Sequence, residues 1–303
     1  MTAIAALCGV LIDYFIGEPR RWHPLVGFGH AAIWLEKKYN RSDSARGKWR
    51  GLACWSLLVI PPSGALYLLL QELSGLTIFL INCLTVYFVV GLNSLASHGR
   101  NVAKKLLLGD TVNARLQLSM MVSRETNELT DQQIAAGTCE SLLENGSDAV
   151  FAPIFWFILF GAPGAIFYRF SNTLDAMWGY RSDRYHQFGW AAARIDDLLN
   201  WLPARLTVFG YAVSGHFSKA ISCSRQQGGL TESPNAGHVM ASGAGALEIT
   251  LGGPATYNGV EHQRPAFGIG PLATAIDIEK SIGLIQRCTV LSLQTVLVIA
   301  FFL

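Results

Sequence analysis

The residues with the clearest chemical potential lie in one stretch, 169–205, which contains five Arg and four Asp but neither Lys nor Glu. Arg presents a planar fork of donors that matches a phosphate or carboxylate at two points, and a short Asp can fix that fork or hold a metal ion. The stretch is also rich in Trp and Tyr. It is therefore equally compatible with Arg–Asp pairs and an aromatic belt at lipid headgroups. Composition alone leaves both interpretations open.

The candidate side chains of this stretch fall at helical and loop positions. Asn172 and Asp175 are three apart and can share a helical edge. Arg194, Asp197 and Arg205 recur at a spacing that predicts one helical face. A glycine-flanked loop carries further arginines that could clamp phosphates. The predicted roles are catalysis by Asp175, Asp197 and Arg181, and contacts to substrate or phosphate by Arg181, Arg184, Tyr185, Arg194, Arg205 and Asn172.

A second cluster, residues 144–148, places Glu144 and Asp148 four apart, so on a helix their carboxylates converge on one face. Such a pair suits Mg²⁺, which shares its coordination shell with substrate phosphates. We predict a metal site formed by Glu144, Asp148 and Asp175. The alternative is a helix N-cap, in which Ser147 or Asp148 accepts backbone N–H bonds before the following apolar run.

Glycine-rich segments after residue 230 form a third cluster. Asn235 and Gly237 belong to a Ser-Pro-Asn-Ala-Gly motif, and Tyr257 follows a Gly-Gly-Pro turn. Glycine lets backbone N–H groups approach an anion closely, so these three residues are predicted to contact substrate. Turns that only join short helices are the alternative. The histidines and cysteines lack metal-ligand spacing, so neither zinc nor haem is expected.

The elements that must position these residues are largely apolar. The chain is 51% hydrophobic and 15% charged, and its mean hydropathy is +0.32. Residues 51–71 and 76–93 are each long enough to cross a bilayer as a helix, and residues 2–16 and 288–303 are predicted as further spans. Residues 206–221 are compatible with a short span or a buried helix.

Basic residues predict the orientation. Residues 20–50 carry eight Lys or Arg and residues 94–148 carry five, so the positive-inside rule puts both loops in the cytoplasm. The apolar run 149–168 contains a Gly-Ala-Pro-Gly break, which favours a re-entrant or interfacial hairpin over a full span. The expected fold is one all-α integral membrane domain over 1–303, with about four or five membrane helices, this hairpin and helical cytoplasmic loops. The net charge of +2 predicts no nucleic-acid partner.

Seven motifs occur in the order of a known family. They are Asp13-Tyr-Phe-Ile-Gly-Glu-Pro19 with His23-Pro24, Glu144-Asn145-x-x-Asp148, Asn172-Thr-Leu-Asp175-x-x-x-Gly179-Tyr180-Arg181, Tyr185-x-x-Phe188-Gly189-Trp190, Arg194-x-Asp196-Asp197-x-x-Asn200-Trp201-x-Pro203-Ala204-Arg205, Ser233-Pro-Asn-Ala-Gly237 and Leu251-Gly-Gly-Pro-Ala-Thr-Tyr257. From about residue 10 to about residue 287, the chain thus resembles the adenosylcobinamide-phosphate synthase family of cobalamin biosynthesis (the CobD/CbiB family).

The resemblance implies a multi-pass ligase of the inner membrane with catalytic loops facing the cytoplasm. Such a ligase joins adenosylcobyric acid to an aminoalcohol phosphate, usually aminopropanol phosphate, and consumes ATP with Mg²⁺ to form adenosylcobinamide phosphate. The implied partners are these two substrates, membrane lipid and other membrane-bound corrinoid enzymes. Three anionic substrates suit a site rich in Arg and carboxylate. A small-molecule transporter and a non-catalytic membrane scaffold for corrinoid enzymes are the alternatives.

Overall fold

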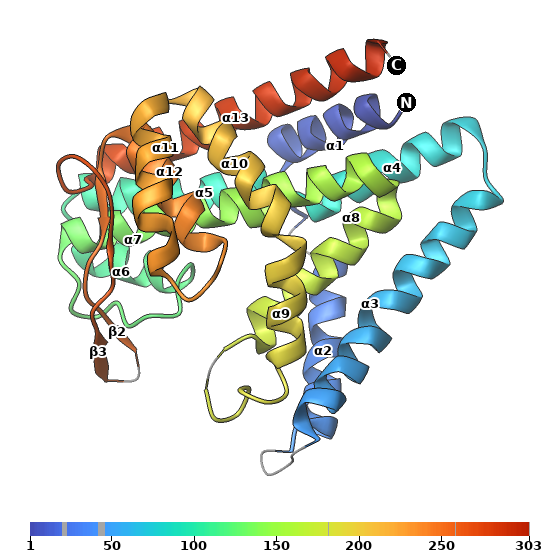
Figure 1. Cartoon of the computed structure of the whole chain (residues 1–303), viewed down its shortest axis with the longest axis horizontal. Coiled ribbons are helices and arrows are strands. Elements are labelled where there is room, and N and C mark those ends of the chain that lie inside the picture. Colours follow the sequence, from blue (N-terminus) through green and yellow to red (C-terminus); the bar gives the residue numbers. More distant parts are fainter. Residues whose placement is uncertain (20–22, 42–45, 181, 258, 303) are drawn as a thin grey trace. The chain divides into compact units, whose positions relative to one another are not determined.

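The computed structural model describes residues 1–19, 23–41, 46–180, 182–257 and 259–302, and most of them are helical (Figure 1). The α-helices are α1 (Thr2–Ile16), α2 (Pro24–Tyr39), α3 (Gly47–Gln71), α4 (Gly75–Val89), α5 (Leu92–Leu107), α6 (Thr111–Ser119), α7 (Asp131–Gly146), α8 (Ala152–Trp178), α9 (Trp190–Leu199), α10 (Trp201–Ser214), α11 (Phe217–Gln227), α12 (Ala236–Leu247) and α13 (Ala275–Phe302). A π-helical turn, η1 (Ser147–Phe151), and a 3₁₀ turn, η2 (Gly228–Leu230), complete the helical part.

Four helical stretches are long and apolar enough to cross a membrane, and they give the chain its membrane character. They are Gly47–Gln71, Gly75–Leu107, Asp131–Trp178 and Ala275–Phe302, and α1 is a shorter apolar helix. The span predicted at 2–16 coincides with α1, and that predicted at 51–71 lies within α3. The span predicted at 76–93 lies within the second stretch, which is divided at Val90–Gly91 between α4 and α5. Residues 288–302 of the span predicted at 288–303 lie within α13, and Leu303 lies outside the described residues. The last stretch begins at Ala275, well before residue 288. The sequence prediction started later because the first turns of this helix are more polar than the rest.

The predicted hairpin at 149–168 corresponds to η1 and the first part of α8. Gly161 has φ 64° and ψ −158°, a conformation outside the helical range that favours glycine, and Pro163 follows it. Figure 1 shows that the ribbon of α8 bends sharply between its two arms. Two helical arms around a Gly/Pro break are therefore present, while re-entry into the membrane stays a prediction.

Two further ranges expected to be continuous helix are each divided between two helices. The spacing of Arg194, Asp197 and Arg205 predicted one helical face, but α9 ends at Leu199 and α10 begins only at Trp201. That prediction is wrong because the chain leaves the regular helix at Asn200. Likewise, residues 206–221 form neither a single span nor a single buried helix. The chain breaks between α10, which ends at Ser214, and α11, which begins at Phe217 and is capped by the side chain of His216.

The described residues form two compact units, each built from segments distant in sequence. Unit 1 comprises Met1–Gly91 and Ala152–Asn200, and unit 2 comprises Leu92–Phe151 and Trp201–Phe302. The sequence predicted one domain over 1–303. The polar candidates are distributed over both units.

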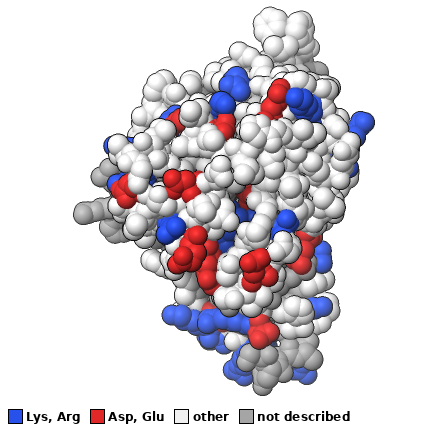
Figure 2. Space-filling model, turned by 90° about the vertical axis from the view of Figure 1, so that its left-hand side faces the viewer, with Lys and Arg blue, Asp and Glu red and all other residues white. Residues whose placement is uncertain are grey.

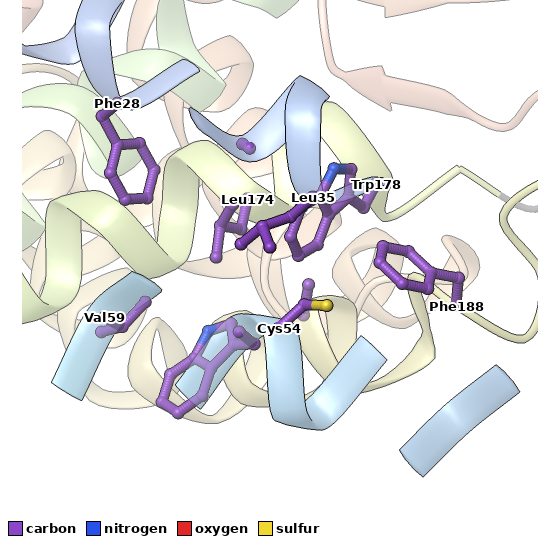
Figure 3. Close-up of a cluster of buried hydrophobic side chains, with 10 residues drawn as sticks. Phe28, Leu35, Cys54, Val59, Leu174, Trp178 and Phe188 are labelled. Atoms are coloured by element: carbon purple, nitrogen blue, oxygen red, sulfur yellow. The ribbon is translucent and has the colours of Figure 1, made fainter. Parts of the chain in front are cut away.

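An aromatic core in unit 1 fixes the elements that carry the first group of candidates. In this core α2, α3, α8 and the segment before α9 meet, and Figure 3 shows their side chains interlocking. Phe28 stacks on Phe170 with 4.0 Å between ring centroids, and Trp178 packs edge-on against Phe188 at 4.9 Å. Buried aromatic pairs of this kind add to the energy of burial itself. The core therefore anchors both ends of the loop between α8 and α9.

Unit 2 combines packed helices with two short antiparallel ribbons. In the helical part α12 packs against α10 and α11, and α13 packs against α5, α7 and α10. The strands β1 (Thr250–Gly252) and β4 (Ala266–Gly268) form one ribbon, and β2 (Ala255–Tyr257) and β3 (Val260–His262) form the other. The all-α prediction did not include these strands. They shape the glycine-rich segment that carries the third group of candidates.

Candidate functional site

A carboxylate cluster lies between α8 and α9 of unit 1. Asp196 is 7% exposed and accepts two amide hydrogen bonds, from Asn172 Nδ2 at 3.2 Å and from Asn200 Nδ2 at 2.9 Å. The buried hydroxyl of Tyr168 donates to Asn200 Oδ1 at 2.8 Å and so fixes the orientation of that amide. The predicted residue Asn172 thus contributes to the site, but its partner is a carboxylate of the neighbouring helix.

The setting of the Asp196 carboxyl group favours its protonated form. Burial, followed by the negative charge of Asp175, raises the pKa of Asp196 to about 8. The two amide hydrogen bonds favour the charged form but do not outweigh burial, and the charge of Asp197 adds to the upward shift. The predicted catalytic residues Asp175 and Asp197 therefore lie within electrostatic reach of a third carboxyl group that composition did not single out.

Glycine makes room for the Asp175 side chain. A Cβ at Gly179 would collide with Asp175 Oδ1, and the Gly179 N–H donates to the Asp175 carbonyl at 2.7 Å. On the outer side of the cluster, Arg194 Nη1 lies 3.5 Å from Asp197 Oδ2, and the Arg194 side chain is 57% exposed. An exposed pair of this kind is weak, so this guanidinium remains accessible to an anionic ligand.

The loop arginines of unit 1 have different settings. The guanidinium of Arg184 donates twice to the buried Glu36 carboxylate, from Nε at 3.0 Å and from Nη2 at 2.9 Å, and its phosphate role stays a prediction. Tyr185 is half-buried, with its ring 5.5 Å from the Arg184 guanidinium carbon. Arg181 lies outside the described residues, so its catalytic and binding roles stay predictions.

In unit 2, two predicted groups come together. Arg205 donates from Nη1 to Asn235 Oδ1 and from Nη2 to the Pro234 carbonyl at 2.9 Å, so it holds the Ser-Pro-Asn-Ala-Gly turn. Gly237 is buried in that turn, where a Cβ would collide with Gly228 and Thr231. Close packing is thus the visible role of Gly237, whereas Arg205 and Asn235 form a polar pair beside α12.

A buried ion cluster in unit 2 was missed by the sequence interpretation. The Glu140 side chain is 6% exposed and accepts from Gly252 N–H at 2.7 Å and from Arg264 Nη1 at 2.8 Å. Arg124 Nη2 lies 3.3 Å from the same carboxylate. The sequence gives little signal for this cluster, because Glu140 is one of three acidic residues of α7, with Asp131 and Glu144, and both arginines lie in other segments.

The cluster places Tyr257 and Glu144 near Arg264. Burial is the largest influence on the Arg264 guanidinium and lowers its pKa, but the charge and hydrogen bond of Glu140 outweigh it and the net shift is upward. Tyr257 and Glu144 contribute further upward shifts. Two residues from separate predicted groups therefore lie within electrostatic reach of one arginine.

The predicted metal site involves residues of both units. Glu144 lies in the last turn of α7 and Asp148 in η1, both in unit 2, whereas Asp175 belongs to unit 1. Ser147 Oγ lies 3.2 Å from the Thr207 hydroxyl, and the chain stays helical through it, so Ser147 does not cap a new helix. Among the described residues, no group of three or more His, Cys, Asp or Glu could hold a metal ion by itself. Magnesium binding stays a prediction.

The fold and the two polar clusters define a helical membrane protein that gathers carboxylates in one unit and arginines in the other. Comparison with protein families gives a match to residues 6–285, and the matching family is described as CobD/Cbib protein. The chain therefore belongs to the CobD/Cbib family, which confirms the resemblance inferred from the motifs.

Named relatives cover nearly the whole chain. A protein of Chromobacterium violaceum named cobalamin biosynthesis protein CobD is 48% identical and matches 92% of this chain and 90% of its own length. Proteins of the same name from Stutzerimonas stutzeri and Mycobacterium tuberculosis are 47% and 35% identical, over 93% of this chain in both cases and over 92% and 90% of their own lengths. No solved structure matches the chain.

Proposed function

We propose that the protein is an ATP-dependent amide ligase of cobalamin biosynthesis in the inner membrane, with its catalytic loops on the cytoplasmic side. It would join the carboxylate of adenosylcobyric acid to the amine of an aminoalcohol phosphate, giving adenosylcobinamide phosphate. Family membership and the names of the relatives support the pathway. The carboxylate cluster between α8 and α9 is the observation that supports the reaction.

Amide formation needs a group that accepts protons from the incoming amine. At neutral pH an aminoalcohol carries an ammonium group, which must lose a proton before its nitrogen can attack an activated carbonyl carbon, and it loses a second when the C–N bond forms. A carboxylate held in a low-dielectric site is a suitable acceptor. We assign this role to Asp175, because the neighbouring Asp196 is buried, has a raised pKa and is already engaged by two amides.

ATP supplies the free energy by phosphorylating or adenylating the substrate carboxylate, and arginines would hold the resulting charge. Arg194 is exposed enough to contact a phosphate, and its pairing with Asp197 keeps it beside the carboxylates. Mg²⁺ commonly binds to one or two protein carboxylates plus substrate phosphates. Asp197 is a suitable donor for such a shared site, in which the ion would neutralise phosphate charge.

The proposed function is tested with purified protein in detergent or nanodiscs. Adenosylcobyric acid, aminopropanol phosphate, ATP and Mg²⁺ are supplied together and then with each omitted, and corrinoids are followed by mass spectrometry. We expect adenosylcobinamide phosphate only in the complete mixture. A folded sample that forms none would contradict the ligase, and substrate movement across vesicles without conversion would instead support transport.

A further inference from the structure

At the Glu140 carboxylate itself, positive charge exceeds negative charge. One carboxylate, on α7, faces two guanidinium groups, Arg124 and Arg264, whose side chains are 7% and 21% exposed. A buried charge is costly unless it is paired, and one carboxylate balances only one of the two arginines. Glu144, one helical turn further along, acts on Arg264 more weakly than Glu140 does and lies on a half-exposed turn.

The two arginines keep donors that the described residues do not use. Arg124 Nε is buried and has no hydrogen-bond partner there, although buried polar atoms are normally satisfied. Among the described residues, the hydrogen bond of the Arg264 guanidinium to Glu140 is made from Nη1 alone. A fork of this kind could accept a further oxyanion without giving up the contact with Glu140.

The surroundings of the pair have the form of a built site. A Cβ at Gly137 would collide with Arg124 Nη2, so this glycine lets the guanidinium lie against α7. Gly252 and Gly253 have φ values of 90° and 91°, which side chains rarely tolerate, and the Gly252 N–H is fixed on Glu140. Beside Gly253 there is open space, since a Cβ there would meet nothing within 4 Å.

The charge surplus is local rather than part of a basic surface. Figure 2 shows Lys and Arg interspersed with Asp and Glu over the viewed face, with no extended patch of one sign among the described residues. An anion attracted by Arg124 and Arg264 would therefore need to contact these two guanidinium groups directly. A compact oxyanion with several acceptor oxygens fits this requirement better than an extended polyanion.

We propose that Arg124 and Arg264, held by Glu140 beside the Gly252–Gly253 turn, form a binding site for a phosphate group. The phosphate would belong to ATP or to the aminoalcohol phosphate, and this part of the inference rests on the proposed function. The site is separate in sequence and in unit from the carboxylate cluster. Glu140 is then a positioning residue that orients both guanidinium groups.

Binding is tested first with inorganic phosphate, which requires no catalysis. Thermal unfolding of the solubilised protein is followed by tryptophan fluorescence in phosphate and in chloride of equal ionic strength. Phosphate should raise the melting temperature of the wild type, because a ligand that binds only the folded state stabilises it. Arg264→Lys keeps the charge but loses the fork, so most of this increase should disappear.

Arg100→Lys is the matched control, since Arg100 also pairs with a carboxylate in unit 2 but is half exposed. It should retain the full phosphate effect. The proposal is overturned if the wild type shows no phosphate effect, or if Arg264→Lys retains the effect in full. Arg264→Lys preserves the positive charge beside Glu140, so its fold should stay intact. The melting temperature of this variant in chloride checks that.

Kinetics then identify the source of the phosphate. In Arg264→Lys, KM should rise about tenfold or more for either ATP or aminopropanol phosphate, as expected for a lost charged hydrogen bond, while kcat changes less. An unchanged KM for both would overturn the link to the substrates. If the wild type forms no product but phosphate stabilisation still depends on Arg264, the proposed function fails and the anion site stands. If the enzyme is active but phosphate does not stabilise it, the proposed function stands and the anion site fails.

Discussion

The two polar clusters differ in how their buried charges are balanced. In unit 1 the buried Asp196 is hydrogen-bonded by neutral amides, and two further carboxylates lie near it. In unit 2 the buried Glu140 is held by two arginines and a backbone N–H. An excess of carboxylates raises proton affinity, whereas an excess of arginines attracts anions. One cluster is thus suited to handle protons and the other to hold phosphate.

The strongest test of the first cluster is Asp175→Asn. Without its proton acceptor, kcat should fall by about 10²- to 10⁴-fold, the usual contribution of general acid–base catalysis, and KM for ATP should change little. Initial rates of adenosylcobinamide phosphate formation measure this effect. Asp183→Asn, in the exposed loop before α9, is the control and should remain fully active. Equal activity of both variants would remove the assignment of Asp175.

The second cluster should be the more sensitive one in stability. Glu140→Ala leaves two buried guanidinium groups on a site without a carboxylate, so the free energy of unfolding should fall by about 3–5 kcal/mol. Chemical denaturation in detergent measures this loss. Glu279→Ala breaks the half-exposed pair with Arg100 and should cost at most about 1 kcal/mol. Similar losses in the two variants would show that the Glu140 cluster is no stronger than a surface pair.

The two clusters should also differ in their response to pH. A carboxyl group with an unfolded pKa of about 4 and a folded pKa of about 8 binds its proton more tightly in the folded state. Its contribution to stability is full below the unfolded pKa and is lost as the pH rises through the folded value. Melting temperatures between pH 5 and 9 should therefore decline in the wild type.

The Asp196→Asn variant isolates this effect. An amide does not titrate, so the decline over that pH range should become clearly shallower, while Asp183→Asn keeps the wild-type slope. Glu140→Gln should leave the slope unchanged, since the titration is assigned to unit 1. A wild-type slope that persists in Asp196→Asn would mean that another group titrates.

The smallest effect is expected for Arg184→Lys. Lys keeps the charge but cannot donate twice to Glu36 as Arg184 does. The melting temperature should drop slightly, because Lys keeps a positive charge beside the buried Glu36 carboxylate. KM for ATP and for aminopropanol phosphate should stay within about threefold, because Glu36 already occupies the donors of Arg184. Arg194→Lys is the counterpart and should raise KM for one of the two. A large KM increase in Arg184→Lys would restore the phosphate role predicted from the sequence.

The apolar elements could be predicted from the sequence because length and hydropathy determine them locally. The apolar runs at 2–16 and 51–71 lie in helices, and the Gly/Pro break near Gly161 marks a real change of direction. The break at Asn200 was missed because the helical spacing of polar residues continues across it, although Pro203 in the first turn of α10 is a signal for a helix start. The short ribbons were missed because each strand has only three residues.

The polar sites were only partly predictable because their partners are remote in sequence. Asn172, Asp175 and Asp197, which the sequence singled out, lie around one cluster whose buried centre is Asp196, and their roles stay predictions. Arg184 pairs with a carboxylate 148 residues away, which spacing along the chain does not reveal. Glu140 and its two arginines come from three separate segments, so only the folded chain brings them together.

The central claim is that amide formation is coupled to ATP cleavage, and the stoichiometry of the two products tests it most directly. In one reaction, the nucleotide product (ADP or AMP) and adenosylcobinamide phosphate are quantified over the same time course. The proposed function predicts one nucleotide cleaved per amide formed, with no cleavage above background when adenosylcobyric acid or aminopropanol phosphate is omitted. Amide formation without nucleotide cleavage, or cleavage independent of both substrates, would contradict it.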